Sequence, residues 1–282
     1  MKKRNLIYLV LIAACVAVFI GYRTTTSLAE DSAKPEITVS DTVVEVSVQD
    51  PDSALLQGIT ARDRRDGDVT ASVLVERVQL VDSDGNITVT CAAFDAAGNV
   101  AKAEFPARYT DYESPRFSLS APFCTPQGVS FDPLNIISAE DTMDGIITHR
   151  IRATYLDENT STPGAHDVQF RVSNSLGETV ELVLPLEVYL TGTYDSRLTL
   201  DDYLVYLPQG AAFNAQSYLD TFTYGSVKTD LSKGVPENYS LKTTGVVDTG
   251  TPGVYGVDYR VTYTLGSANH TAYSRLIVVV EG

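Results

Sequence analysis

Tryptophan is absent from this chain of 282 residues, and histidine, cysteine and methionine occur only three, three and two times. His149, His166 and His270 have no second ligand at the short spacings of zinc sites, so neither zinc binding nor histidine-based catalysis is indicated. Three cysteines, with Cys15 inside an apolar run, do not make a disulfide framework. No G-x-S-x-G motif is present to expose a nucleophilic serine. We therefore predict that the chain is not an enzyme.

Basic residues are also few, because 21 Lys and Arg stand against 36 Asp and Glu, for a net charge of −15. The first 29 residues hold four basic residues and no acidic one, so the remainder is more acidic still. An acidic surface repels phosphate backbones, and no basic stripe offsets it. We expect no binding to nucleic acid.

What the chain does contain is a repeat, in which one strand lies between two turns. The landmarks keep one register, with spacings of 79 and then 89 residues: Gly85, Gly164 and Gly253 open the strand, and Gly98, Gly177 and Gly266 close it. A glycine at the closing position can adopt the positive φ that a tight hairpin needs. A repeat of about 80 residues favours three modules over one large domain.

Each repeated strand alternates apolar and polar residues. From Val257 to Leu265 the apolar side chains share one face, and Asp258 and Arg260 point to the other. A strand with one apolar face must bury it against a second layer, so a sandwich or barrel is predicted.

Cys91 takes the place of large apolar residues on this inward face. The repeat aligns it with Phe170 and Tyr259, so we expect a buried, inert thiol. A disulfide between Cys91 and Cys124 would have to cross modules and is the less favoured alternative.

The N-terminus carries a basic flank, Met1–Arg4, and then the apolar run Leu6–Tyr22. As a helix that run would reach roughly 26 Å, close to the hydrocarbon thickness of a bilayer. We expect an uncleaved membrane anchor, with the basic flank in the cytoplasm and the rest of the chain outside. Two alternatives stay open: cleavage of a signal peptide after Ala29, and lipidation of Cys15, since Ile12–Cys15 resembles a lipobox.

Short motifs accompany the repeated strand. Residues 61–70 follow the pattern A-x-D-x-x-D-G-D-[IVL]-T, residues 95–99 are D-A-A-G-N, and residues 139–148 keep part of the first pattern. Together these motifs resemble the bacterial surface immunoglobulin-like domain family, which is also catalogued from repeats in a pesticidal crystal protein. The resemblance spans roughly residues 35–282 in three tandem copies, the third divergent because it lacks the Asp-Gly segment. It implies extracellular β-sandwich modules without catalytic residues.

We therefore predict an all-β fold of three tandem immunoglobulin-like β-sandwich modules after an N-terminal transmembrane helix or signal segment. The predicted divisions are a membrane anchor or signal segment (1–23), a flexible tether (24–34) and the three modules (35–110, 111–190 and 191–282).

Clustered acids in the first module are candidates for binding calcium, which takes six to eight oxygen ligands: Asp63, Asp66, Asp68 and Asp95. The alternative is that Asp63 and Asp66 accept hydrogen bonds from turn amides. The second repeat has Ile146 and Asn174 in place of Asp68 and Asp95. Because the ligand set halves between copies, the turn interpretation is favoured, and no other cofactor is predicted.

Tyrosines gather in the first half of the third module, and exposed tyrosine is favoured at recognition surfaces. The candidates for binding a sugar or a protein are Tyr203, Tyr206, Tyr218, Tyr224 and Tyr239. Ordinary packing of these rings in the core is the alternative.

The predicted function is adhesion or recognition by a membrane-anchored bacterial surface protein whose partner is a cell-surface protein or a glycan. One alternative is a passive spacer or scaffold of the cell envelope, which would show no exposed tyrosine patch. Another is an accessory region associated with a carbohydrate-active system. A hydrolase would need a polar pocket with perturbed carboxylates, which the sequence does not indicate.

Overall fold

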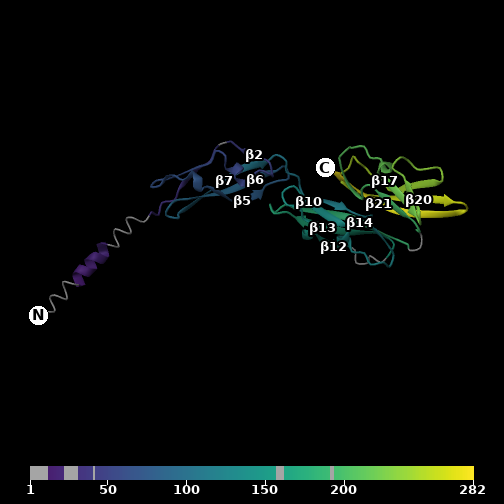
Figure 1. Cartoon of the computed structure of the whole chain (residues 1–282), viewed down its shortest axis with the longest axis horizontal. Coiled ribbons are helices and arrows are strands. Elements are labelled where there is room, and N and C mark those ends of the chain that lie inside the picture. Colours follow the sequence, from purple (N-terminus) through teal and green to yellow (C-terminus); the bar gives the residue numbers. More distant parts are fainter. Residues whose placement is uncertain (1–11, 22–30, 41, 157–161, 191–193) are drawn as a thin grey trace. The chain divides into compact units, whose positions relative to one another are not determined.

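The computed structural model describes residues 12–21, 31–40, 42–156, 162–190 and 194–282 (Figure 1). The chain divides into two compact units, residues 1–112 (unit 1) and 113–282 (unit 2). Apart from the helix at residues 12–21 and short 3₁₀ turns, the described elements are β-strands (Figure 1). The predicted all-β fold with sandwich-like sheets is therefore confirmed.

Unit 1 contains two sheets, with strand orders β1–β3–β4 and β2–β7–β6–β5 in its described part. The elements are β1 (Glu36–Thr38), β2 (Val44–Val46), η1 (Asp52–Leu56), β3 (Thr60–Asp63), β4 (Gly67–Asp68), η2 (Thr70–Ser72), β5 (Leu74–Leu80), β6 (Asn86–Phe94) and β7 (Val100–Tyr109). Ala61 of β3, Val89 of β6 and Phe105 of β7 are buried. They place the core on the inward faces of both sheets.

Unit 2 repeats this arrangement twice. The first pair of sheets has the orders β8–β10–β11 and β9–β14–β13–β12, and the second has β15–β17–β18 and β16–β21–β20–β19. The first pair comprises β8 (Arg116–Leu119), β9 (Cys124–Pro126), η3 (Pro133–Asn135), β10 (Ile137–Asp141), β11 (Gly145–Ile146), η4 (Thr148–Arg150), β12 (Arg152–Tyr155), β13 (Gly164–Ser173) and β14 (Thr179–Tyr189). The second comprises β15 (Arg197–Leu200), β16 (Leu204–Pro208), η5 (Ala215–Tyr218), β17 (Leu219–Tyr224), β18 (Val227–Asp230), β19 (Tyr239–Thr244), β20 (Gly253–Leu265) and β21 (Ala268–Glu281). In each of the three sets the short second strand pairs in parallel with the last strand.

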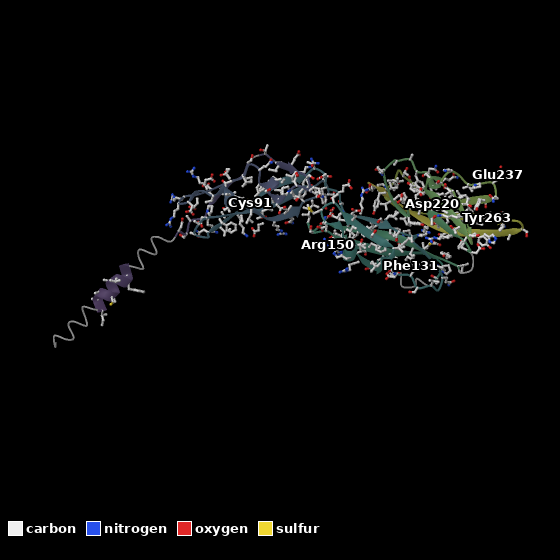
Figure 2. The ribbon with its side chains drawn as sticks, viewed as in Figure 1. Cys91, Phe131, Arg150, Asp220, Glu237 and Tyr263 are labelled. Carbon is white, nitrogen blue, oxygen red and sulfur yellow. The ribbon has the colours of Figure 1, made fainter. Side chains whose placement is uncertain are left out.

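The register of the repeat is preserved in three dimensions. Cys91 of β6, Phe170 of β13 and Tyr259 of β20 occupy the same inward row, and each is 0% exposed. Cys91, labelled in Figure 2, lies within the strand layers of unit 1. The inward orientation predicted for this row is confirmed.

The buried residues of unit 2 form one continuous cluster. It extends from Phe117 of β8 to Val280 of β21 and includes both pairs of sheets. The predicted boundary between residues 190 and 191 lies within this unit, and the division of the chain into three modules stays a prediction.

The predicted N-terminal membrane anchor is wrong for the part of the chain that the structure describes. The described helical residues there are 12–21. No described helix is both long and apolar enough to cross a membrane. The anchored localisation and the membrane partnership that depended on this helix are not supported.

Two other predictions concern the same region. Cys15, the candidate for lipidation, is an exposed free thiol of the described helix. Ala29, the candidate cleavage site, and residues 24–30 of the predicted tether lie outside the described residues.

Candidate functional site

The five tyrosines predicted to bind a ligand take part in packing at separate places. Tyr203 and Tyr239 are buried, whereas Tyr206, Tyr218 and Tyr224 are half-buried. Their ring partners are Phe213 for Tyr218, His270 for Tyr224, and Phe222 and Tyr263 for Tyr239. No aromatic contact recorded among the described residues joins two of the five. Their role as a ligand surface stays a prediction.

A different set of tyrosines lines a cleft of about 450 Å³ in unit 2, between β14 and the sheet formed by β19, β20 and β21. Tyr189 comes from the end of β14, Tyr194 precedes β15, and Tyr273 lies on β21. Charged residues complete the wall, with Glu187 on β14, Lys242 on β19, and Asp258 and Arg260 on β20. The volume falls in the range of small-ligand sites, roughly 300–1,000 Å³.

The strand register explains why these polar groups face the cleft. Lys242, Arg260 and Tyr273 pair directly across β19, β20 and β21. Side chains in one row of a sheet share a face, so these three stand beside each other. The sequence predicted that Arg260 lies opposite the apolar face of β20. It did not predict what would lie against that polar face.

The three cleft tyrosines form an aromatic cluster. The rings of Tyr194 and Tyr273 stack with centroids 5.4 Å apart and an interplanar angle of 26°. Tyr189 meets Tyr194 edge-on at 5.3 Å, and its centroid lies 5.4 Å from that of Tyr273. All three are half-buried, so the cluster offers rigid aromatic surface to the cleft.

Arg275 of β21 is buried beside this cleft and contacts both of its carboxylates. It is 6% exposed, and its Nη1 atom lies 3.0 Å from Glu187 Oε2 and 2.8 Å from Asp258 Oδ1. The Tyr273 hydroxyl donates a hydrogen bond of 2.6 Å to Asp258 Oδ1. Burial raises the pKa of Tyr273, and its hydrogen bond to the Asp258 carboxylate raises that pKa further. Both cleft carboxylates are therefore engaged by Arg275.

Two cations of the cleft face solvent without an acidic partner recorded among the described residues. Lys242 and Arg260 are both exposed. The Arg260 Nη2 atom donates a hydrogen bond of 3.1 Å to the Tyr194 hydroxyl, and its guanidinium carbon lies 5.8 Å from the centre of that ring. Two cations and two carboxylates line the cleft, and buried Arg275, which lies outside the lining, contacts both carboxylates. Because Arg275 pairs with the carboxylates, Lys242 and Arg260 leave a local positive excess on an acidic protein.

The four acids predicted as calcium ligands separate into two groups in unit 1. One carboxylate oxygen each of Asp63, Asp95 and a third acid, Asp31, lies within 4.8 Å of the others. Asp66 Oδ2 instead accepts a hydrogen bond of 2.8 Å from the Ala96 amide. Asp68 Oδ1 accepts one of 3.0 Å from the amide two residues ahead.

Asp31 escaped the sequence prediction, although a signal was present. It stands four residues before Pro35, and Asp111 stands four residues before Pro115 in the next repeat. Asp111 accepts hydrogen bonds from the Ser47 hydroxyl and the Val48 amide of unit 1, at 2.6 and 2.9 Å. In both copies the acid at this position accepts a hydrogen bond from a backbone amide.

The cysteines agree with the sequence prediction. Cys91 and Cys124 are free, and Cys91 is 0% exposed. Burial raises the pKa of the Cys124 thiol to about 12.

Known proteins are similar to this chain only in part. No family model matches it, so membership of the bacterial surface immunoglobulin-like family stays a prediction. The pesticidal crystal protein Cry22Aa of Bacillus thuringiensis is 30% identical over 145 residues, which are 50% of this chain and 19% of that protein. This partial match agrees with the resemblance to repeats of a pesticidal crystal protein. The chain spans about a fifth of the length of this relative.

Solved structures match most of this chain at low sequence identity and low TM-score. Mouse cadherin-23 EC22–24 is 12% identical, with 88% of this chain and 99% of that chain covered and a TM-score of 0.22. Drosophila N-cadherin EC1–4 is 13% identical, with 89% and 67% covered and a TM-score of 0.21. A Clostridium perfringens ZmpB structure of CBM51-2 with GlcNAc and INT domains is 14% identical, with 88% and 41% covered and a TM-score of 0.22. Similarity at this level of identity and TM-score carries no argument about the fold and assigns no partner.

Proposed function

We propose that this chain is a non-enzymatic recognition protein and that the cleft of unit 2 binds an anionic glycan. The observation that carries the proposal is the joint presence of three clustered tyrosine rings and a local excess of positive charge in one cleft.

The tyrosine rings suit a carbohydrate. Sugar rings present C–H groups on their faces and hydroxyls on their edges, and tyrosine offers an apolar face with one polar tip. The stacking of Tyr194 on Tyr273 fixes the rings before a ligand arrives, so binding costs little side-chain entropy.

The exposed cations select the charge of the ligand. Lys242 and Arg260 lie on the same row of the sheet, and neither is neutralised by a described acid. A carboxylate or phosphate on the sugar would pair with them, and an arginine can do so through two parallel hydrogen bonds. A neutral glycan would leave this charge unused.

The engaged state of the carboxylates supports binding rather than hydrolysis. A glycosidase needs one carboxyl group as an acid and a second as a base or nucleophile. Here Asp258 and Glu187 both contact Arg275. Burial raises the pKa of Glu187, while the charge of Arg275 opposes that rise. Neither carboxylate could act as an acid, base or nucleophile without giving up its ion pair with Arg275.

The test is binding of the full chain to a printed array of neutral and uronate-containing glycans, followed by calorimetry on the strongest acidic oligosaccharide. We expect Tyr194→Ala to weaken binding by at least about tenfold, because it removes the stacking surface and a hydrogen-bond partner of Arg260. Lys242→Ala should weaken binding and make it less sensitive to salt.

Matched controls come from the same unit. Tyr155→Ala and Arg171→Ala alter exposed residues that do not line the cleft and should leave affinity unchanged. Equal binding by wild type and Tyr194→Ala, or binding to neutral glycans alone, would contradict the proposal. Capture of proteins but no glycan would favour a protein partner, and no binding at all would favour a spacer.

A further inference from the structure

Three aspartates from separate segments converge at one end of unit 1. Asp63 is the last residue of β3, Asp95 directly follows β6, and Asp31 precedes β1. Asp63 and Asp95 are 2% and 8% exposed, and Asp31 is half-buried. A carboxylate oxygen of each lies within 4.8 Å of the other two.

The local turns occupy only one oxygen of Asp63 and one of Asp31. Asp63 Oδ1 accepts hydrogen bonds from the amides of Arg65 and Asp66, at 2.6 and 3.0 Å. Asp31 Oδ1 accepts one from the Ala33 amide at 3.0 Å. Asp63 Oδ2 and Asp31 Oδ2 are buried and receive no hydrogen bond from any described residue. Buried polar atoms in proteins are almost always paired, so these two oxygens indicate a missing partner.

The cluster brings three acidic side chains together, and two of them, Asp63 and Asp95, are shielded from water.

The second repeat contains the same turn, but it has an asparagine amide where the first repeat has an aspartate carboxylate. Asp141 corresponds to Asp63, and its Oδ1 atom accepts hydrogen bonds from the amides of Met143 and Asp144, at 2.9 and 2.8 Å. Asn174 corresponds to Asp95, and its Nδ2 atom donates a hydrogen bond of 3.0 Å to Asp141 Oδ2. In this copy the side-chain amide satisfies the oxygen that is left without a donor in the first copy. A carboxylate at that position cannot donate, so another group has to satisfy the Asp63 oxygen, and a cation is the group that suits several neighbouring carboxylates.

We propose that Asp31, Asp63 and Asp95 bind a calcium ion. Carboxylate oxygens are the ligands that calcium prefers, at roughly 2.3–2.6 Å and in flexible geometry. Oxygens within 4.8 Å of one another are no farther apart than about two such bond lengths, so small side-chain shifts let one ion contact all three. The ion would fasten the segment before β1 to the turns after β3 and β6. The site lies in unit 1 and is independent of the glycan proposal.

The experiment follows calcium binding and thermal unfolding of the full chain after removal of metal with EDTA. We expect calorimetry to detect Ca²⁺ binding, and Ca²⁺ to raise the melting temperature of wild type. Asp95→Asn copies the second repeat. It should weaken Ca²⁺ binding by at least about tenfold, because it removes a charged ligand.

The melting temperature of the same variant in EDTA distinguishes a metal site from an acid that only stabilises the turn. In EDTA, Asp95→Asn should melt at a higher temperature than wild type, because the new amide can donate to Asp63 Oδ2 as Asn174 does to Asp141. Asp68→Asn is the matched control, since Asp68 is held by a turn amide and should leave Ca²⁺ affinity unchanged.

Three results would overturn the proposal. One is a wild-type protein that neither binds Ca²⁺ in calorimetry nor melts at a higher temperature with it. Another is an equal response to Mg²⁺, which would remove the assignment to calcium. The third is Asp95→Asn binding Ca²⁺ as tightly as wild type.

Discussion

At the scale of single residues, Asp95 and Asn174 show how one side-chain group can change what a turn requires. Both begin the same loop, in which the backbone amide four residues ahead donates to the side chain. The amide of Asn174 also donates to Asp141 and completes its turn within the chain. The carboxylate of Asp95 lies beside that of Asp63 instead. An aspartate that replaces an asparagine in a repeat can therefore mark a cation site rather than neutral drift.

The buried cysteines give a prediction at the same scale. Burial raises the pKa of Cys124 from 9.0 to about 12 and raises that of Cys91 as well. At neutral pH the rise for Cys124 leaves about a thousandfold less thiolate, the reactive form. We expect both thiols to react slowly with a maleimide in the native protein and rapidly in urea. Mass spectrometry of labelled peptides distinguishes them from exposed Cys15, and rapid native labelling of Cys91 would contradict its buried position.

At the scale of elements, the turns that bound β6 differ in how closely the chain approaches them. Gly85 and Gly98 have φ values of 82° and 85°. A Cβ atom on Gly85 would collide with the Tyr109 carbonyl oxygen, whereas one on Gly98 would meet no atom within 4 Å. Gly85 also accepts a hydrogen bond of 2.9 Å from the Tyr109 amide, so it holds the end of β7.

We therefore expect Gly85→Ala to destabilise unit 1 more than Gly98→Ala does. In both variants a non-glycine residue at positive φ lowers the free energy of unfolding by roughly 1–2 kcal/mol. Gly85→Ala should cost about 1–3 kcal/mol more, because of the collision. Urea unfolding measures the difference, and equal free energies of unfolding would show that the turn relaxes around the added methyl group.

Local patterns made much of this architecture predictable. Alternation along β20 placed Tyr259 inward and Arg260 outward, and the closing glycines Gly98, Gly177 and Gly266 do have positive φ. The opening position is less uniform, because Gly253 does not share the positive φ of Gly85. Period and turn chemistry are local properties, which explains why the sequence carries them.

The sites depend on contacts between distant segments, which leave no local pattern. Tyr189, Tyr194 and Tyr273 meet only because β14 approaches the sheet of β20 and β21. Asp31 precedes the first strand, and the spacing to proline that it shares with Asp111 does not indicate which residues it meets. The apolar run at the N-terminus led to the prediction of a membrane anchor, which no described helix supports.

At the scale of the whole molecule, the distribution of buried residues predicts how the chain unfolds. The core of unit 2 is continuous through both of its pairs of sheets, and Arg275 links them by ion pairs to Glu187 and Asp258. Segments that share a core tend to unfold together. Unit 1 has its own compact core.

Calorimetric melting of the full chain should show two cooperative transitions, one for each unit, rather than three. Arg275→Met should lower the melting temperature of unit 2 and leave that of unit 1 unchanged, because it leaves two partly buried carboxylates without their cationic partner. Ca²⁺ should move only the transition of unit 1. A third transition, or a calcium response in unit 2, would contradict this assignment.

The ion pairs of Arg275 also limit where the chain can be cut to make fragments for experiments. A fragment that begins at residue 191 would lose Glu187 and Tyr189, and with them one wall of the proposed glycan cleft. It would also expose apolar surface now covered by the neighbouring repeat. The smallest fragment that keeps the cleft whole is thus a pair of repeats, residues 113–282, which a cut after residue 112 would release.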